Sequence, residues 1–395
     1  MRNLSGLRNC AVARDEAVIS IEAPGRLEVL GNHTDYNEGV VLGAAMDRAV
    51  RIRGGPRPDG RITMRSRSYR PVEITLPELR PQQGRTSWAN YPFGVASELV
   101  AMDIAVGGFS AEIESDLPAA AGLGSSAAVA VAMAFFLLKL KQRELPPLEI
   151  AKLCQRAEHR FAAVQSGLLD QVMSIFGRVN HLVFFDCRSE QIQLMPLPAD
   201  LVFIVADSGI KRELAAGKYN ERRAETRAAA DALGVRALRD IATVAALDSS
   251  RRGSAKADER RTYQTENLRR SETAATEPAA LFRRAAHIVG ENERVWRACE
   301  LLERGDAARL GKLMNESQES SRTNFENSTP ELDQLVDLAR KQPGVLGARL
   351  TGGGFGGAII ALCEKSCAQT AATNLASVAA QTFICRPADG ALLRK

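Results

Sequence analysis

The stretch "DLPAAAGLGSSAAVAVA", residues 116–132, places glycines and small side chains between a predicted strand and a predicted helix. The strand is the alternating "FSAEIESDL" (109–117), and the helix is the apolar, alanine-rich "GSSAAVAVAMAFFLLKLK" (124–141). Unobstructed amides at a helix N-terminus suit a phosphate group, and nearby hydroxyls suit the Mg²⁺ that accompanies a nucleotide. An equally weighted alternative is that Ser125 only caps the helix and the glycines only permit a tight turn. The chain has no GK[ST] sequence, which excludes a Walker A loop.

The elements around this stretch mix strands and helices without regular alternation. "AVISIEA" (17–23) and "LVFIVADSG" (201–209) are predicted strands, and "HLVFFDC" with "QIQLMPL" (181–197) is a predicted hairpin. "LEIAKLCQRAEHRFA" (148–162) has the apolar spacing of an amphipathic helix. This irregular order favours the α+β class over a doubly wound parallel sheet. At 395 residues the chain exceeds a usual single domain, so we expect two domains.

Composition limits the classes of partner and compartment. The 52 basic and 47 acidic residues leave a net charge of +5, too diffuse to indicate nucleic acid but compatible with anionic small molecules. The seven scattered cysteines lack CxxC pairs, which favours a reducing cytoplasm over a disulfide scaffold or zinc site. Neither a secretory signal nor an apolar run of 18 residues is present. We therefore expect a cytoplasmic protein with no membrane partner.

Two further stretches are rich in glycine and polar residues. "GRLEVLGNHTDYNEG" (25–39) follows a predicted strand and is either a solvated turn or a pocket for a ligand rich in hydroxyls. "GARLTGGGFGGAIIAL" (347–362) contains a formal GxGxxG at Gly352, Gly354 and Gly357. The following residues favour a strand, whereas a dinucleotide fingerprint needs a helix there. We therefore predict two strands joined by a wide glycine loop.

Taken in this order, the three stretches resemble the motifs of the GHMP small-molecule kinases, most closely the galactokinase members. "GRLEVLGNHTDYNEG" is similar to their sugar signature, "GLGSSAA" to their phosphate loop and "LTGGGFGG" to their third motif. "AEHRFAAVQSGLLDQ" (157–171) is similar to the segment with the catalytic aspartate, and "DSGIKRELAAGKYNERRAE" (207–225) to the segment with a sugar-contacting tyrosine. "TPELDQLV" and "ICRPADGA" also match, so the resemblance covers nearly the whole chain.

The resemblance implies a two-domain α+β GHMP kinase fold with the active site in the cleft between the domains. Residues 1–200 would form the N-terminal domain, with the sugar signature and phosphate loop. Residues 201–395 would form the C-terminal domain, with the glycine-rich motif 351–357 and a polar segment at 248–278. That segment almost lacks large apolar side chains, which predicts a solvated excursion. The implied ligands are ATP, Mg²⁺ and a sugar, and we expect a monomer.

The resemblance also implies roles for individual residues. Asp170 would take the proton of the sugar's anomeric hydroxyl, with Arg26 beside it to stabilise the anionic transition state. The other positions are Asn32, His33, Asp35, Gly167 and Tyr219 for the sugar; Trp88, Tyr91, Gly122, Leu123, Gly124, Ser125 and Ser126 for the nucleotide; and Ser126 and Glu158 for Mg²⁺. The alternatives are a solvated surface charge for Glu158 and ordinary core aromatics for Trp88 and Tyr91.

Two positions depart from the galactokinase pattern. Asn32 stands where those kinases carry a glutamate before the signature histidine, and Glu28 stands where they usually carry an asparagine. D-galactose is our first choice of substrate, and another aldose or a uronic acid is the alternative that Asn32 leaves open. A second alternative is a regulator that binds sugar and ATP without turnover. The intact "GLGSSAA" and the presence of Asp170 favour an enzyme.

Overall fold

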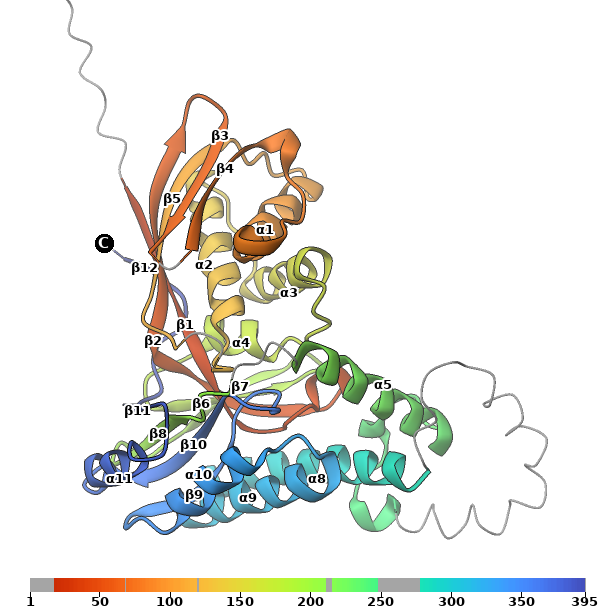
Figure 1. Ribbon diagram of the computed structural model, residues 1–395. Helices are drawn as coiled ribbons and strands as arrows, with labels where there is room; N and C mark the ends of the chain where they lie inside the picture. The colour runs from red at the N-terminus through yellow and green to blue at the C-terminus, as the bar shows by residue number, and fades with distance from the viewer. Residues whose placement is uncertain (1–17, 68, 119–120, 211–214, 248–277, 395) are drawn as a thin grey trace, which may run out of the picture.

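The structure, a computed structural model, describes residues 18–67, 69–118, 121–210, 215–247 and 278–394. The polar segment predicted at 248–278 therefore lies outside the described residues, except for its last residue. In the described part the chain forms two β-sheets with helices packed against them (Figure 1). The predicted α+β class is confirmed. None of the described helices combines the length and the apolar character that a membrane span requires.

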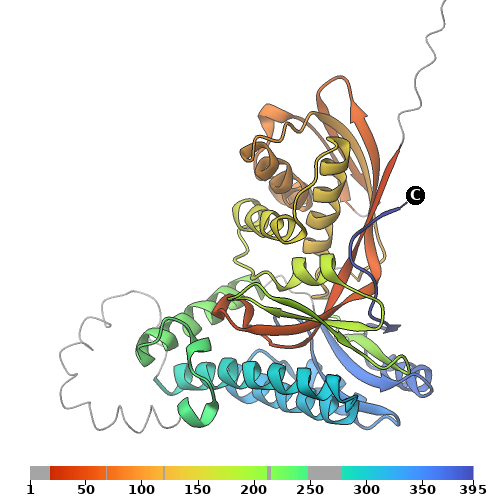
Figure 2. The same cartoon turned by 180° about the vertical axis from the view of Figure 1, so that it is seen from behind.

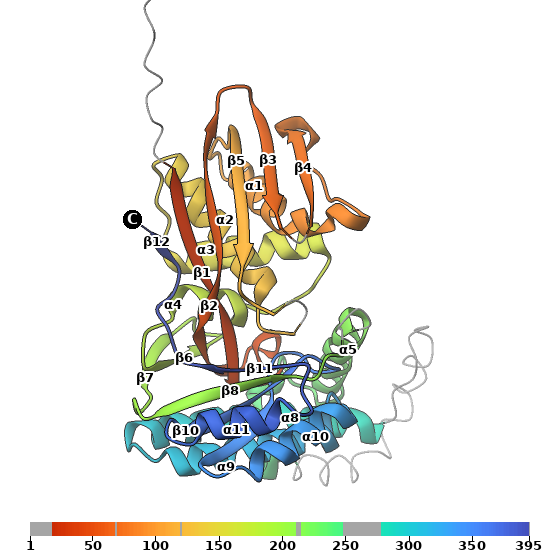
Figure 3. The ribbon, with the colours of Figure 1, turned by 60° about the vertical axis from the view of Figure 1, so that its left-hand side comes forward.

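The first sheet has the strand order β12-β1-β2-β5-β3-β4, and β6 and β7 join it through β2 (Figure 3). Its strands are β1 (Ile19–Leu30), β2 (Val40–Arg57), β3 (Arg61–Ser66), β4 (Tyr69–Thr75), β5 (Gly108–Ser115), β6 (His181–Asp186), β7 (Ile192–Pro196) and β12 (Leu392–Arg394). The helices of this half are α1 (Asn90–Ala101), α2 (Ser125–Leu140), α3 (Pro147–Ala157) and α4 (Leu169–Phe176), of which α2 and α4 pack directly on the sheet. The predicted hairpin at 181–197 is confirmed as the antiparallel pair β6–β7.

The second sheet has the order β11-β8-β10-β9. Its strands are β8 (Leu201–Asp207), β9 (Val345–Leu350), β10 (Ala358–Glu364) and β11 (Gln381–Cys385). The helices of this half are α5 (Ala215–Leu233), α8 (Pro278–Glu303), α9 (Ala307–Ser320), α10 (Pro330–Arg340) and α11 (Ala368–Leu375), several of which are seen from behind in Figure 2. Short 3-10 turns lie at Asp35–Asn37, Leu76–Glu78, Gly84–Ala89 and Leu238–Asp240, and π-helical turns at Glu158–Ala162 and Ser321–Phe325.

Strand β8 is a continuous apolar run because both of its faces are covered. Val202 and Ile204 pack in one cluster with residues of α10 and α11. Phe203 and Val205 pack in another cluster that includes residues of α8 and α9. A strand buried on both faces shows no polar alternation, which is why the sequence alone predicts it as buried.

Strand β1 is longer than the predicted segment 17–23, because it continues to Leu30. Its pairing with β2 shifts register between Pro24 and Arg26 and again between Glu28 and Leu30. Such bulges bend a strand and re-aim its side chains, and they are common beside functional sites. The polar Arg26 and Glu28 lie between these two shifts.

The predicted division at residue 200 falls between β7 and β8, where the chain passes from the first sheet to the second. Strand β12 departs from this division, since it returns to the first sheet and pairs with β1. The domain boundary itself stays a prediction. The glycine loop predicted within 347–362 is confirmed, since β9 and β10 are an antiparallel pair on either side of it.

Candidate active site

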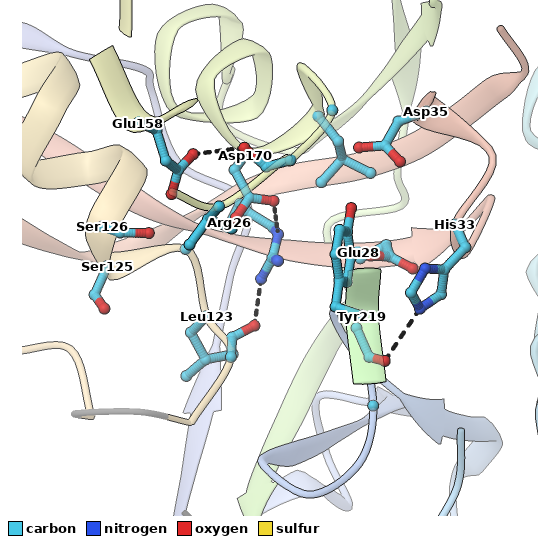
Figure 4. A pocket seen from close by; sticks show the side chains of 18 of the residues that line it. Arg26, Glu28, His33, Asp35, Leu123, Ser125, Ser126, Glu158, Asp170 and Tyr219 are labelled. Carbon is cyan, nitrogen blue, oxygen red and sulfur yellow. Dashed lines mark hydrogen bonds and ion pairs between the residues drawn. The ribbon is translucent and has the colours of Figure 1, made fainter. Parts of the chain in front are cut away.

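A cavity of about 330 Å³ lies where the end of β1, the start of α2 and the glycine loop meet. It is lined by residues from both halves of the sequence (Figure 4). The predicted site residues in its lining are Arg26, Asn32, His33, Asp35, Tyr91, Gly122, Leu123, Gly124, Ser125, Ser126, Glu158, Gly167, Asp170 and Tyr219. The fold therefore brings predicted site residues as distant in the sequence as Arg26 and Tyr219 to one cavity, together with Phe355 of the glycine loop.

Trp88 is the predicted site residue that is absent from this lining. Its ring stacks on Tyr69 with the ring centroids 5.8 Å apart. Its Nε1 donates a hydrogen bond to the backbone oxygen of Arg70 at 3.0 Å. The side chain therefore packs against β4 (Tyr69–Thr75), and its contact with a nucleotide stays a prediction.

Arg26 and Asp170 form an ion pair on the cavity wall. Arg26 Nε lies 2.7 Å from Asp170 Oδ1, and the arginine is buried while the aspartate is partly exposed to the cavity. The guanidinium also donates to the backbone oxygen of Gly122, and the backbone nitrogen of Arg26 donates to Leu123 O at 2.9 Å. Arg26 thus fixes Asp170, at the start of α4, against the loop before α2 (Figure 4).

The backbone of the loop before α2 has a conformation that can accommodate an anion. Gly122 and Gly124 have φ values of 74° and 73°, in the left-handed region that favours glycine. A Cβ on Gly124 would lie 3.0 Å from Cγ of Arg26, so a side chain there would also press on the ion pair. Helix α2 begins at Ser125, so its first free amides and the positive end of its dipole face this loop.

Glu158 is buried, with only 5% of its surface exposed, so the alternative of a solvated surface charge is wrong. It lies at the start of the π-helical turn Glu158–Ala162, a rare backbone form that is frequent at functional sites. Its Oε2 accepts hydrogen bonds from Ser166 Oγ at 2.6 Å and from Gln171 Nε2 at 3.1 Å, and Ser126 also hydrogen-bonds to the carboxyl group. Burial raises the pKa of Glu158 to about 7.

On the opposite side of the cavity, Asp35 lies in the turn after β1. Burial raises its pKa to about 7, and the negative charges of Glu28 and Asp170 act in the same direction. A Cβ on Gly167 would lie 1.9 Å from Oδ2 of Asp35, so residue 167 must be glycine for this carboxylate to keep its place. The two residues are therefore fitted to one another.

His33 is held in a cluster of aromatic rings beside Asp35. Its backbone has the unusual φ of 62°, and its ring centroid lies 5.1 Å from that of Tyr219 and 4.5 Å from that of Phe325. Its Nδ1 is 2.7 Å from Oη of Tyr36. These neighbours fix the imidazole at the cavity wall, with Tyr219 from α5 packed on it.

Comparison with known proteins identifies the family. Residues 90–178 match the GHMP kinases N terminal domain, residues 298–381 match the GHMP kinases C terminal model, and residues 12–56 match the Galactokinase galactose-binding signature. Galactokinase from Roseiflexus sp. (strain RS-1) is 36% identical over 384 residues, which cover 94% of this chain and 92% of that protein. The chain belongs to the galactokinase family of GHMP kinases. It is therefore a sugar kinase.

Other relatives of the kinase agree with this assignment. Galactokinase from Homo sapiens is 36% identical over 387 residues, covering 95% of this chain and 92% of that protein. The crystal structure of Lactococcus lactis galactokinase complexed with galactose has a TM-score of 0.84 and 29% identity, with 95% of each chain covered. A mevalonate kinase at 18% identity, with a TM-score of 0.65, covering 94% of this chain and 99% of its own, shares the fold.

Several residues in or beside the kinase's cavity were missed by sequence reasoning. Ser166 and Phe355 line it, yet each lies inside a stretch already singled out, so the motif itself was the available signal. Glu291 and Asn327 contact the turn after β1 from far along the sequence, and no local pattern marks them. Their importance depends on which segments pack together.

Proposed function

We propose that this kinase transfers the γ-phosphoryl group of ATP to the anomeric hydroxyl of D-galactose. The observation that carries the proposal is the Arg26–Asp170 ion pair, which joins the sugar signature to the start of α4 beside the loop before α2. The galactose-binding signature at residues 12–56 and the galactose named with the Lactococcus lactis structure support this choice of sugar.

In the proposed reaction Asp170 accepts the proton of the anomeric hydroxyl as that oxygen attacks the phosphorus. Phosphoryl transfer asks little covalent chemistry of a protein and depends on alignment and on cations around the developing charge. Arg26 supplies one such cation, and its hydrogen bond at 2.7 Å keeps one oxygen of Asp170 occupied. The other oxygen, Oδ2, is left to face the hydroxyl.

We propose that the amides at the start of α2 hold the phosphates, and that Ser126 and Glu158 hold Mg²⁺. A hydroxyl and a carboxylate in contact with one another are the hard oxygen donors that Mg²⁺ prefers, and this ion usually takes few protein ligands beside water and phosphate. When bound, Mg²⁺ neutralises negative charge on the phosphate oxygens. Trp88 and Tyr91 are proposed to contact the base of the nucleotide.

The remaining proposed roles concern the sugar. Asp35, His33 and Tyr219 offer polar groups around the cavity, and Gly167 leaves room for Asp35. Asn32 is proposed to stand near the end of the sugar distant from Asp170. We also retain residues 1–200 and 201–395 as the two proposed domains.

The test of this function is ADP release from ATP and Mg²⁺ with a panel of reducing sugars, with ³¹P NMR to locate the new phosphate. We expect D-galactose to be preferred and the product to carry phosphate on the anomeric oxygen. Preference for galacturonate or a pentose would replace galactose as the substrate. Binding of sugar and ATP without ADP release would instead identify a regulator.

The raised pKa of Asp35 predicts how sugar use depends on pH. As a carboxylate it accepts hydroxyl hydrogen bonds more strongly than as a neutral acid. With ATP and Mg²⁺ saturating, kcat/KM for the sugar should rise about tenfold per pH unit and level off above about 7. Asp35→Asn should lower kcat/KM and remove this inflection.

Because the pKa of Glu158 lies in the same range, Glu158→Gln is the matched control, and its kcat/KM profile should keep the inflection. An inflection that persists in Asp35→Asn would contradict the assignment.

A further inference from the structure

The floor of the cavity carries a carboxylate with no role in the proposed reaction. Glu28 lies on β1 between the two register shifts, is 5% exposed, and lines the cavity. Its Oε1 accepts a hydrogen bond from Nδ2 of Asn32 at 2.6 Å. Within the described residues, no hydrogen bond or ion pair is made by its second oxygen, Oε2. A carboxylate oxygen without a protein partner can accept a hydrogen bond from a ligand.

Asn32, by contrast, is occupied by protein. It has no exposed surface, and its Nδ2 donates one hydrogen to Glu28 and the other to the backbone oxygen of Gly352 at 2.8 Å. Its Oδ1 accepts from Nδ2 of Asn327 at 2.9 Å. Both amide hydrogens are therefore used by Glu28 on β1 and by the glycine loop, and the amide oxygen accepts from the segment before α10. Little capacity is left for a substrate.

A buried arginine lies behind Glu28 and balances its charge. Arg349, on β9, is fully buried, with Nη1 at 3.7 Å from Oε1 of Glu28 and donating to Val29 O at 3.1 Å. Its Nε and Nη2 have no hydrogen-bond partner among the described residues. Burial raises the pKa of Glu28, while the positive charges of Arg349 and Arg26 oppose that rise. The arginine favours the ionised carboxylate.

We propose that the Glu28 carboxylate is a specificity-determining group that accepts a hydrogen bond from one sugar hydroxyl and repels sugars with a carboxylate at that position. The inference rests on the proposed function and adds a residue to it. Glu28, Asp35 and Asp170 all line the cavity. Glu28 and Asp170 are close enough to Asp35 that their negative charges raise its pKa. Three acidic acceptors suit a neutral ligand rich in hydroxyls and disfavour an anionic one.

The proposal changes what Asn32→Glu should do. If residue 32 met the sugar directly, a carboxylate there would strengthen binding. In this structure the new carboxylate would instead replace the donor that lies 2.6 Å from Glu28, and two negative charges would face one another. We expect Asn32→Glu to raise the sugar KM, and the exchange Glu28→Asn with Asn32→Glu to recover part of that loss. A lower KM for galactose in Asn32→Glu alone would overturn the proposal.

The decisive experiment removes the hydroxyls of galactose one at a time, as the 2-, 3-, 4- and 6-deoxy sugars, and compares kcat/KM in the parent and in Glu28→Gln. For one deoxy sugar we expect a loss of about 10- to 100-fold in the parent, the scale of a hydrogen bond to a charged group. In Glu28→Gln the same sugar should lose only about 2- to 10-fold relative to galactose, as for a neutral bond. Glu22→Gln, on the same strand outside the cavity lining, should behave as the parent.

A merely structural role for Glu28 would lower kcat/KM for every sugar by the same factor, and that result would overturn the inference. Glu28→Asp keeps the charge opposite Arg349, so it serves if Glu28→Gln does not fold. It should likewise weaken the dependence on that one hydroxyl. A parent that phosphorylates galactose while its deoxy-sugar losses match those of the variants refutes this inference alone. A parent that does not phosphorylate galactose refutes the proposed function and this inference together.

Discussion

Asp170→Asn is expected to lower kcat by about 10² or more, the scale of losing a general base. The amide has nearly the shape of the carboxylate, and its oxygen can still accept the 2.7 Å hydrogen bond from Arg26 Nε. The loop before α2 and the sugar-side residues stay in place, so the affinities for ATP and galactose should change little. Single-turnover ADP formation and calorimetric binding of each ligand measure the two quantities separately.

The matched control for this variant is Asp200→Asn, a conversion of the same kind at an exposed position between β7 and β8. It should leave turnover at the parent's value. Equal turnover in Asp170→Asn and the parent would remove Asp170 from the mechanism. Loss of ligand binding in Asp170→Asn would show that the ion pair organises the cavity and would leave the base unidentified.

Glu291→Gln is expected to lower the free energy of unfolding by about 3–5 kcal/mol, the usual cost of breaking a buried ion pair from one side. Glu291, on α8, has no exposed surface, and its Oε2 accepts the backbone hydrogens of Gly31 and Asn32 at 2.9 Å each. Its Oε1 lies 2.6 Å from Nε of Arg294. The neutral amide leaves this arginine without its counter-charge. Denaturant unfolding at pH 7 measures the loss.

The same residue gives stability a pH dependence. Burial raises the pKa of Glu291, but the charges of Arg294 and Arg349 outweigh it and hold the pKa well below its usual range. A lowered carboxyl pKa stabilises the fold above the unfolded-state value of about 4 and loses that effect as the pH falls further. The difference between parent and Glu291→Gln should therefore shrink in acid. Glu300→Gln, exposed on the same helix, is the control. A Glu291→Gln protein that loses no more than about 1 kcal/mol, the usual effect of an ordinary substitution, would contradict the prediction.

The parts of the site that sequence predicted are those with a local pattern. Gly122 to Ser126 can be identified because small residues before an apolar helix have a direct backbone consequence. Asp170 and Asp35 are predicted from motifs that also include the residues beside them in the sequence. Strand β8 was found because its apolar run is uninterrupted. Each of these depends on residues that are adjacent in the chain.

The parts that sequence did not predict depend on packing between distant segments. Asn32 is predicted from its motif, but its protein partners are not: they include Asn327, 295 positions away, and Gly352, 320 positions away. The partner that holds the backbone of Asn32 is Glu291, whose own neighbours show no motif. Which donors and acceptors remain for a ligand is decided only after these bonds are made.

The return of β12 to the first sheet has a consequence for the order of events during synthesis. Ser20 pairs with Arg394, so the first and last strands of the described chain lie side by side at one edge of the sheet (Figure 3). Domains generally fold in the order in which the ribosome releases them. Here the edge beside β1 remains open until β12 is released, and Asn32 lacks its partner Gly352 until the loop between β9 and β10 is released. The cavity of the nascent kinase is therefore complete only after Gly353, Gly354 and Phe355, which line it, have left the ribosome.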